Sequence, residues 1–153
     1  MKKSLAAFLI ILLLSCDNNS NTKTSMYKTT GAIIQYDDAL SAIIDTSTKP
    51  EIIAEGYEWS EGPLWIEKHK MLLFSDVPMN TVYKWTEEKG TEVYLKPSGY
   101  TGSTPSKCKE PGSNGLTLDK EGNLVLCQHG DRQMGKMDAP LDKPQAKYIV
   151  LAN

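Results

Sequence analysis

The sequence predicts an all-β protein built of short antiparallel strands. Eleven glycines and eight prolines stand against two phenylalanines in 153 residues, which suits frequent turns and short elements better than a helical bundle. After Pro50, strand-like apolar pieces of four to seven residues alternate with turn-forming residues. A repeated pattern of strands then runs through residues 61–137. Together these observations predict an architecture made of repeated β units.

One short helix is predicted at residues 37–44, before the strands begin. Two acidic residues open this segment, and negative charge favours a helix N-terminus. Leu40, Ile43 and Ile44 follow at helical spacing on one face. We therefore expect a short amphipathic N-terminal helix.

The strand-like pieces are bounded by turn formers, among them Pro63, Asn80 and Gly90. The strands are expected at residues 52–54, 64–66, 71–75, 81–85 and 92–95. Short strands at this spacing indicate antiparallel pairing between neighbours along the chain.

The chain repeats itself at an offset of 53 residues. The matched segments are 61–65 with 114–118, 71–74 with 124–127 and, one deletion later, 82–85 with 134–137. A repeat near 50 residues with about four strands is typical of a propeller blade, although two unrelated hairpins could share the pattern by chance. The offset gives Glu61 and Asn114 equivalent places on neighbouring blades, where polar residues can converge on a propeller axis. It also matches Asp76 with His129, so that Asp76 is either a pocket residue or part of a strand-end turn.

The charge balance excludes some partners. Without Lys2 and Lys3, which lie in the leader described next, 15 basic residues face 19 acidic ones. A mildly acidic chain without a basic block gives no electrostatic reason to expect nucleic acid as a partner.

The first fifteen residues are expected to be a lipoprotein signal peptide. Two lysines precede an apolar stretch at residues 5–14, about half the roughly 20 residues that span a bilayer. The stretch ends in Leu-Leu-Ser-Cys, which resembles a bacterial lipobox in which Cys16 is acylated; the alternative is a plain secretory signal. Residues 16–32 are mostly polar, as expected of a flexible tether, and residues 33–153 form the folded body. We expect an exported bacterial lipoprotein, held at the membrane and facing the periplasm or cell surface.

Two further cysteines, Cys108 and Cys127, remain in the body. An exported compartment permits a disulfide between them, but sequence does not say whether their Cα atoms approach closely enough. Cys127 lies in an apolar run, so a buried free thiol is the alternative.

Several motifs, in order, resemble the gluconolactonase/regucalcin-like family (senescence marker protein/gluconolactonase/luciferin-regenerating-enzyme-like). They lie at residues 55–65, 73–78, 83–85, 113–119, 121–124 and 128–132. The resemblance covers about residues 33–137, nearly all of the body.

The resemblance implies a six-bladed β-propeller with one divalent cation, usually calcium, at the centre of its tunnel. It further implies hydrolysis of sugar lactones or related esters, with the metal polarising the lactone carbonyl for attack by water. Glu61 matches the family's metal-binding glutamate. Asn114 matches an asparagine that contacts substrate or the metal's water shell, and His129 matches a histidine at the pocket wall. The general base is expected to lie beyond the chain end, so no catalytic residue is assigned.

The sequence departs from the family in two ways. Some members carry an arginine two positions before the asparagine, where this chain has Gly112, so a preference for acidic sugars is not supported. The chain also has room for about two blades of six, and we expect a fragment or truncated product. The alternatives to a lactonase are a non-catalytic sugar- or protein-binding lipoprotein and an inactive fragment.

Overall fold

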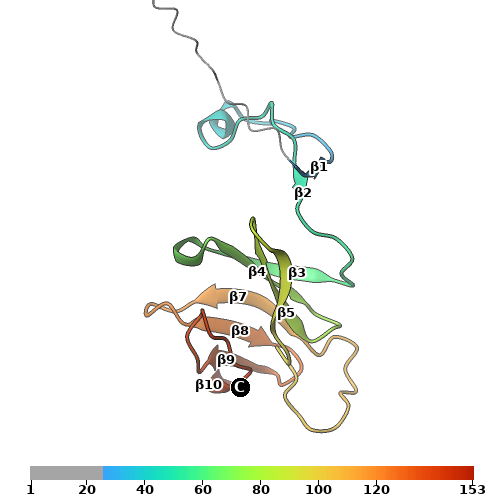
Figure 1. Ribbon diagram of the computed structural model, residues 1–153, viewed down its shortest axis with the longest axis vertical. Coiled ribbons are helices and arrows are strands. Elements are labelled where there is room, and N and C mark those ends of the chain that lie inside the picture. Colours follow the sequence, from blue (N-terminus) through green and yellow to red (C-terminus); the bar gives the residue numbers. More distant parts are fainter. Residues whose placement is uncertain (1–25) are drawn as a thin grey trace, which may run out of the picture.

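A computed structural model describes residues 26–153 of the chain. Two four-stranded antiparallel sheets follow an N-terminal segment that lies outside them (Figure 1), where the Tyr27 ring is 6.1 Å from the ring of Trp85 in the first sheet. The expected signal peptide and Cys16 lie outside the described residues. No helix in the described range is long and apolar enough to cross a membrane.

The two sheets are two consecutive blades of the same design. The first blade comprises β3 (Ser60–Ile66), β4 (Met71–Asp76), β5 (Thr81–Thr86) and β6 (Gly90–Leu95), with the short 3₁₀ helix η2 (Glu67–His69) between β3 and β4. The second comprises β7 (Ser113–Leu118), β8 (Leu124–Gln128), β9 (Gln133–Met137) and β10 (Tyr148–Ala152). In each sheet, consecutive strands pair antiparallel in chain order. The all-β architecture with about two blades is confirmed, and four of the five expected strands fall inside β3–β6.

The third strand of the repeat needs a correction. Leu73 pairs with Lys84 in the first blade, and Leu126 pairs with Gly135 in the second. Lys84 therefore corresponds to Gly135, whereas the sequence repeat matched it with Lys136. Both hairpin turns have four residues, 77–80 and 129–132, but the β4–β5 ladder continues for one more pair, Asp76 with Thr81, so the second hairpin is two residues shorter between equivalent positions.

The N-terminal segment contains a small sheet and the expected helix. Strand β1 (Lys28–Thr29), at the end of the expected tether, pairs antiparallel with β2 (Glu51–Ile52). The helix is confirmed as the 3₁₀ helix η1 (Asp38–Ala42), where the Asp37 carboxylate accepts a hydrogen bond from the Ala39 amide at 2.8 Å. Its apolar residues do not pack into a core, since Ile43 is 84% exposed.

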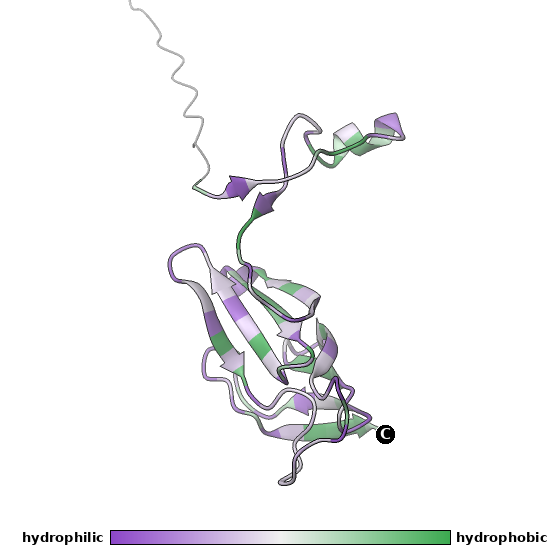
Figure 2. Ribbon diagram, turned by 90° about the vertical axis from the view of Figure 1, so that its right-hand side faces the viewer, coloured by the Kyte–Doolittle hydropathy of each residue, from purple (hydrophilic) through white to green (hydrophobic). Residues whose placement is uncertain are grey.

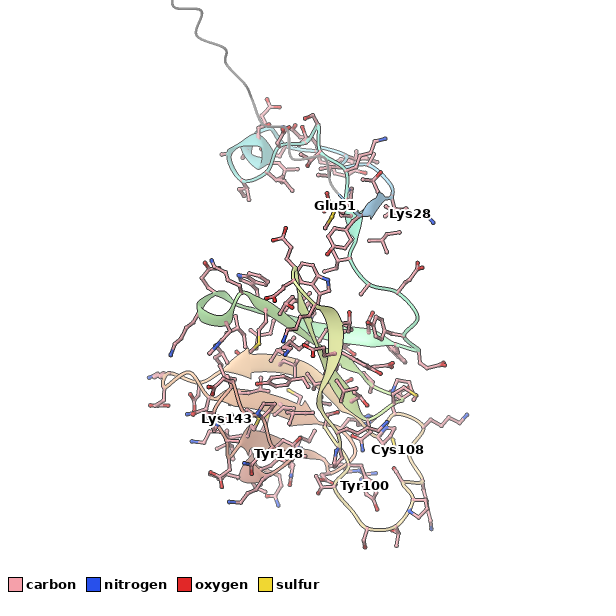
Figure 3. The ribbon with its side chains drawn as sticks, in the orientation of Figure 1. Lys28, Glu51, Tyr100, Cys108, Lys143 and Tyr148 are labelled. Atoms are coloured by element: carbon pink, nitrogen blue, oxygen red, sulfur yellow. The ribbon has the colours of Figure 1, made fainter. Side chains whose placement is uncertain are left out.

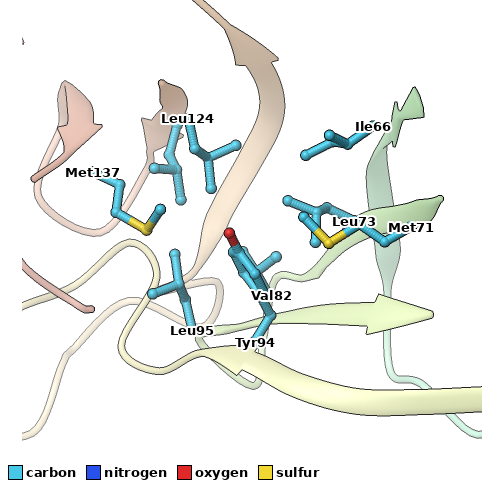
Figure 4. Close-up of a cluster of buried hydrophobic side chains, with 9 residues drawn as sticks. Ile66, Met71, Leu73, Val82, Tyr94, Leu95, Leu124 and Met137 are labelled. Atoms are coloured by element: carbon cyan, nitrogen blue, oxygen red, sulfur yellow. The ribbon is translucent and has the colours of Figure 1, made fainter. Parts of the chain in front are cut away.

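The hydrophobic core lies between the two sheets (Figure 4). Its buried members are Ile66, Met71, Leu73, Val82, Tyr94 and Leu95 of the first blade and Leu124, Leu126 and Met137 of the second. The Tyr94 hydroxyl donates to the carbonyl of Leu141 at 2.8 Å, and burial raises the pKa of this phenol. Each blade thus buries one face against the other.

The outer strand of the second blade presents apolar side chains to solvent. Ile149, Val150 and Leu151 of β10 are each about half exposed. Figure 2 shows the hydrophobic colouring of this strand beside the C-terminus. The blade therefore carries apolar surface that nothing in residues 26–153 covers.

Both cysteines of the body are free and exposed, so the structure contains no disulfide between Cys108 and Cys127. The expectation of a buried Cys127 is wrong because side chains alternate along β8. Leu124 and Leu126 are fully buried in the core, whereas the Cys127 side chain lies beside its cross-strand partner Met134, with Sγ 3.5 Å from Sδ.

We expect Leu126→Ala to lower the free energy of unfolding by about 2–5 kcal/mol, because it removes a fully buried side chain between the blades. Urea unfolding followed by tryptophan fluorescence measures the change. Val93→Ala is the control, since Val93 is 61% exposed in a strand, and we expect its effect to stay within about 0.5 kcal/mol. Equal effects of the two substitutions would contradict the inter-blade core.

Candidate functional site

The residues of the expected site gather at one end of the two blades, which we call the mouth. Here β3 and β7 begin, while β4 and β8 end, as antiparallel hairpins require. Glu61 is the second residue of β3, and Asn114 is the second residue of β7. Asp76 ends β4, and His129 follows the last residue of β8.

The predicted equivalence of Glu61 and Asn114 is wrong by one residue. Glu61 pairs with Ser75 in the first blade, whereas Ser113 pairs with Gln128 in the second. Ser75 and Gln128 are 53 residues apart, as the repeat predicts, but Glu61 and Ser113 are only 52 apart. The true counterpart of Glu61 is therefore Ser113, and Asn114 lies one position further along its strand.

The two residues are nevertheless neighbours across the blades. Gly62 has a φ of +59°, and a Cβ at this position would lie 2.5 Å from the carbonyl oxygen of Asn114. The buried Ser75 hydroxyl lies 2.9 Å from the Ser113 hydroxyl and donates to the Asn114 carbonyl at 3.0 Å. The backbones that carry Glu61 and Asn114 thus touch directly.

A second set of contacts joins the blades beside this point. The Gly112 amide donates to the carbonyl of Val77 at 2.8 Å, and a Cβ on Gly112 would come within 2.5 Å of that oxygen. The Ser113 amide donates to the hydroxyl of Ser98 at 3.1 Å. We call the small residues that make these contacts the blade seam: Gly62, Ser75, Ser98, Gly112 and Ser113. Only small side chains allow the two backbones to approach this closely.

Glu61 and Asn114 have side chains available for a ligand. The Glu61 carboxylate is exposed on the wall of a hollow of about 230 Å³, beside the rings of Tyr57 and Phe74. Asn114 is half-buried. Neither side chain makes a hydrogen bond or ion pair with another residue in the described part of the chain. A larger hollow of about 540 Å³ lies at the opposite end of the blades, away from these residues.

Asp76 has a structural role at the mouth. It is 2% exposed, and its carboxylate accepts hydrogen bonds from the amides of Glu58 at 3.3 Å and Trp59 at 3.2 Å. Burial raises the pKa of the neighbouring Tyr83, and the negative charge of Asp76 adds to the effect. Asp76 therefore holds the backbone that leads into β3.

His129 lies beside a carboxylate that the sequence did not single out. Its side chain is 43% exposed, and its Nδ1 lies 4.0 Å from Oε2 of Glu110. Glu110 belongs to the long loop between β6 and β7, which also carries Tyr100 and Cys108 (Figure 3). No periodicity or motif in that loop signals the contact.

The oxygen donors at the mouth fit calcium in kind but not in number. Calcium takes six to eight oxygen ligands, and Glu61 and Asn114 offer a carboxylate and an amide oxygen. Within residues 26–153, no group of three or more acidic, histidine or cysteine side chains could hold a metal ion. The two candidate side-chain oxygen ligands at the mouth are therefore those of Glu61 and Asn114.

Two consecutive four-stranded blades with polar residues at the starts of their inner strands define a propeller-type β protein. Residues 59–150 match the family described as the SMP-30/Gluconolactonase/LRE-like region, and the chain belongs to that family. It is 41% identical to a gluconolactonase from Zymomonas mobilis over 122 residues, which is 79% of this chain.

Two solved structures support the fold. A protein assigned as a gluconolactonase is similar over 66% of this chain, with 26% identity and a TM-score of 0.51. A gluconolactonase from Xanthomonas campestris is similar over 83% of this chain, with 24% identity and a TM-score of 0.57. This chain spans 33% of the Zymomonas protein and 29% and 39% of the two structures.

We expect Gly62→Ala to destabilise the protein more than Gly90→Ala. Both glycines have a positive φ, +59° and +67°, so both substitutions strain the backbone by about 1–3 kcal/mol. Only the Gly62 substitution also drives a methyl group into Asn114, because nothing lies within 4 Å of a Cβ at Gly90. Urea unfolding of both variants measures the difference, and equal losses would show that the seam is not tightly packed.

Proposed function

We propose that this chain is part of a calcium-dependent hydrolase of sugar lactones. One observation carries the proposal: the blade seam brings Glu61 and Asn114 side by side, with both side chains uncommitted. The family membership and the similarity to a gluconolactonase from Zymomonas mobilis support the same reaction class.

Each residue has a distinct task in this proposal. Glu61 binds the cation through its carboxylate, and Asn114 orients the substrate or the water bound to the cation. A calcium ion bound there would polarise the lactone carbonyl and stabilise the charge that develops on its oxygen. His129, on the neighbouring strand end, offers its imidazole to a hydroxyl group of the sugar.

The remaining calcium ligands and the general base come from further blades, so the chain is a fragment of the active unit. Two blades bury one face each, while β10 keeps half-exposed Ile149, Val150 and Leu151. Unpaired edges and uncovered sheet faces are unfavourable for an isolated protein. The chain's span of about a third of the Zymomonas protein agrees with this proposal.

The blade seam bears on the choice of lactone. An arginine for an acidic sugar would stand at Gly112, where a Cβ would lie 2.5 Å from the carbonyl oxygen of Val77. A side chain at that position would push the blades apart. We therefore propose lactones of neutral sugars as the substrate class.

Glu61→Gln should lower calcium-dependent hydrolysis of gluconolactone by about 100-fold or more, because it removes the charged ligand. The assay uses the longest product of the gene, with and without a chelator. Glu55→Gln is the control, since Glu55 is also exposed and precedes β3 by a few residues. Sugar binding without hydrolysis in the unmodified protein would favour the binding lipoprotein, and absence of both would favour an inactive fragment.

We further propose that Cys16 is acylated and holds the protein at the membrane, on the strength of the lipobox resemblance. Cys16→Ser should abolish incorporation of labelled palmitate during expression in a bacterial host and release the protein from the membrane fraction. Cys108→Ser is the control, because Cys108 is exposed and free in the folded body. Absence of labelling in the unmodified protein would leave a plain secretory signal as the explanation, and unchanged labelling of the Cys16 variant would place the lipid on another residue.

A further inference from the structure

Glu110 and His129 form a carboxylate–imidazole pair that no motif accounts for. The Glu110 Oε2 atom lies 4.0 Å from Nδ1 of His129, and the two side chains are 38% and 43% exposed. A side-chain rotation that moves either atom by about 1 Å would bring the two atoms to hydrogen-bond distance. In a site without ligand, the distance between such groups is often longer than a hydrogen bond and shortens when the ligand binds.

The backbones beside both residues are locked together. A Cβ on Gly130, next to His129, would lie 2.3 Å from the carbonyl oxygen of Pro111, next to Glu110. The Asp131 carboxylate also accepts hydrogen bonds from the amide and the hydroxyl of Thr101, the latter at 2.6 Å. Both ends of the loop that carries Glu110 are thereby held against the end of β8, so the pairing does not depend on a mobile loop.

Nothing in the described part of the chain competes for either group. Among residues 26–153, no lysine or arginine lies within 4.0 Å of the Glu110 carboxylate, and no other carboxylate lies within that distance of His129. A neutral imidazole carries one proton on either of its two nitrogens. A carboxylate facing one nitrogen favours the form in which that nitrogen carries the proton.

We propose that Glu110 is a positioning residue for His129. Its carboxylate accepts a hydrogen bond from the protonated Nδ1, which orients the ring and leaves Nε2 as a hydrogen-bond acceptor. Within the proposed function, on which this last role rests, Nε2 then accepts a hydrogen bond from a hydroxyl of the sugar lactone. The proposal thus adds a positioning residue from the loop between β6 and β7.

The test is ¹⁵N nuclear magnetic resonance of the ring nitrogens above about pH 8, where histidines are neutral. The chain has only two histidines, so His69 serves as an internal reference. His69 lies in η2 at the far end of the first blade, with no carboxylate within 4.0 Å among residues 26–153. We expect His129 in the unmodified chain to carry its proton mainly on Nδ1, in contrast to His69.

Glu110→Ala should shift the His129 proton toward Nε2 and leave His69 unchanged. Lys109→Ala is the matched control, because Lys109 is an exposed residue of the same loop and adjoins Glu110. The inference is overturned if His129 resembles His69 in the unmodified chain, or if Glu110→Ala leaves the spectrum of His129 unaltered. This readout needs no catalytic activity.

A kinetic measurement separates this inference from the proposed function. In the lactonase assay, Glu110→Ala should raise KM about 5-fold through the weakened hydrogen bond to substrate, with a smaller effect on kcat. If the spectrum changes as expected but no lactone is hydrolysed by the unmodified protein, the pair stands and the proposed function fails. If hydrolysis occurs and KM is unchanged in Glu110→Ala, the substrate role of the pair is wrong.

Discussion

The arrangement of the site depends on the blade seam, where two backbones approach closely enough to touch. Gly62 leaves no room for a side chain against Asn114, and Gly112 leaves none against Val77. The hydroxyls of Ser75 and Ser113 are fully buried at this point, and each satisfies the other. Larger side chains would separate the sheets, and buried polar groups without partners would cost stability. The seam is therefore both a packing constraint and the reason that Glu61 and Asn114 are neighbours.

The strands and their faces follow from sequence more readily than their register does. Alternating apolar residues and turn formers predict β4 to β6 closely, because burial on one face and tight turns are local properties. The register depends on bulges near the start of β3 and β7, which displace pairing by one residue in each strand. The turn after β3 is also one residue shorter than the turn after β7, so an ungapped alignment matches Glu61 with Asn114 instead of Ser113. The sequence thus identifies the residues of the mouth but misjudges their equivalence.

Glu110 escapes sequence reasoning for a different reason. It lies in an irregular loop whose position comes from distant side chains. Asn80 accepts hydrogen bonds from the amides of residues 98, 99 and 100 through its side-chain oxygen, at 3.0, 2.7 and 3.2 Å. The Asp131 carboxylate holds the next residue, Thr101. These contacts join three separate turns, and neither periodicity nor a local motif reports a contact set by tertiary packing.

In the proposed calcium-dependent hydrolase, one seam makes only part of the metal site. A blade contributes one or two polar residues at the start of its inner strand, and the seam fixes their distance from those of the next blade. Two blades therefore give one carboxylate and one amide, whereas calcium needs several more oxygens. Adding donors requires adding blades, and each added blade would also cover an apolar face of the kind that β10 exposes. In that proposal, burial of those faces and completion of the metal site are the same structural event, so stability and activity should appear together as blades are added.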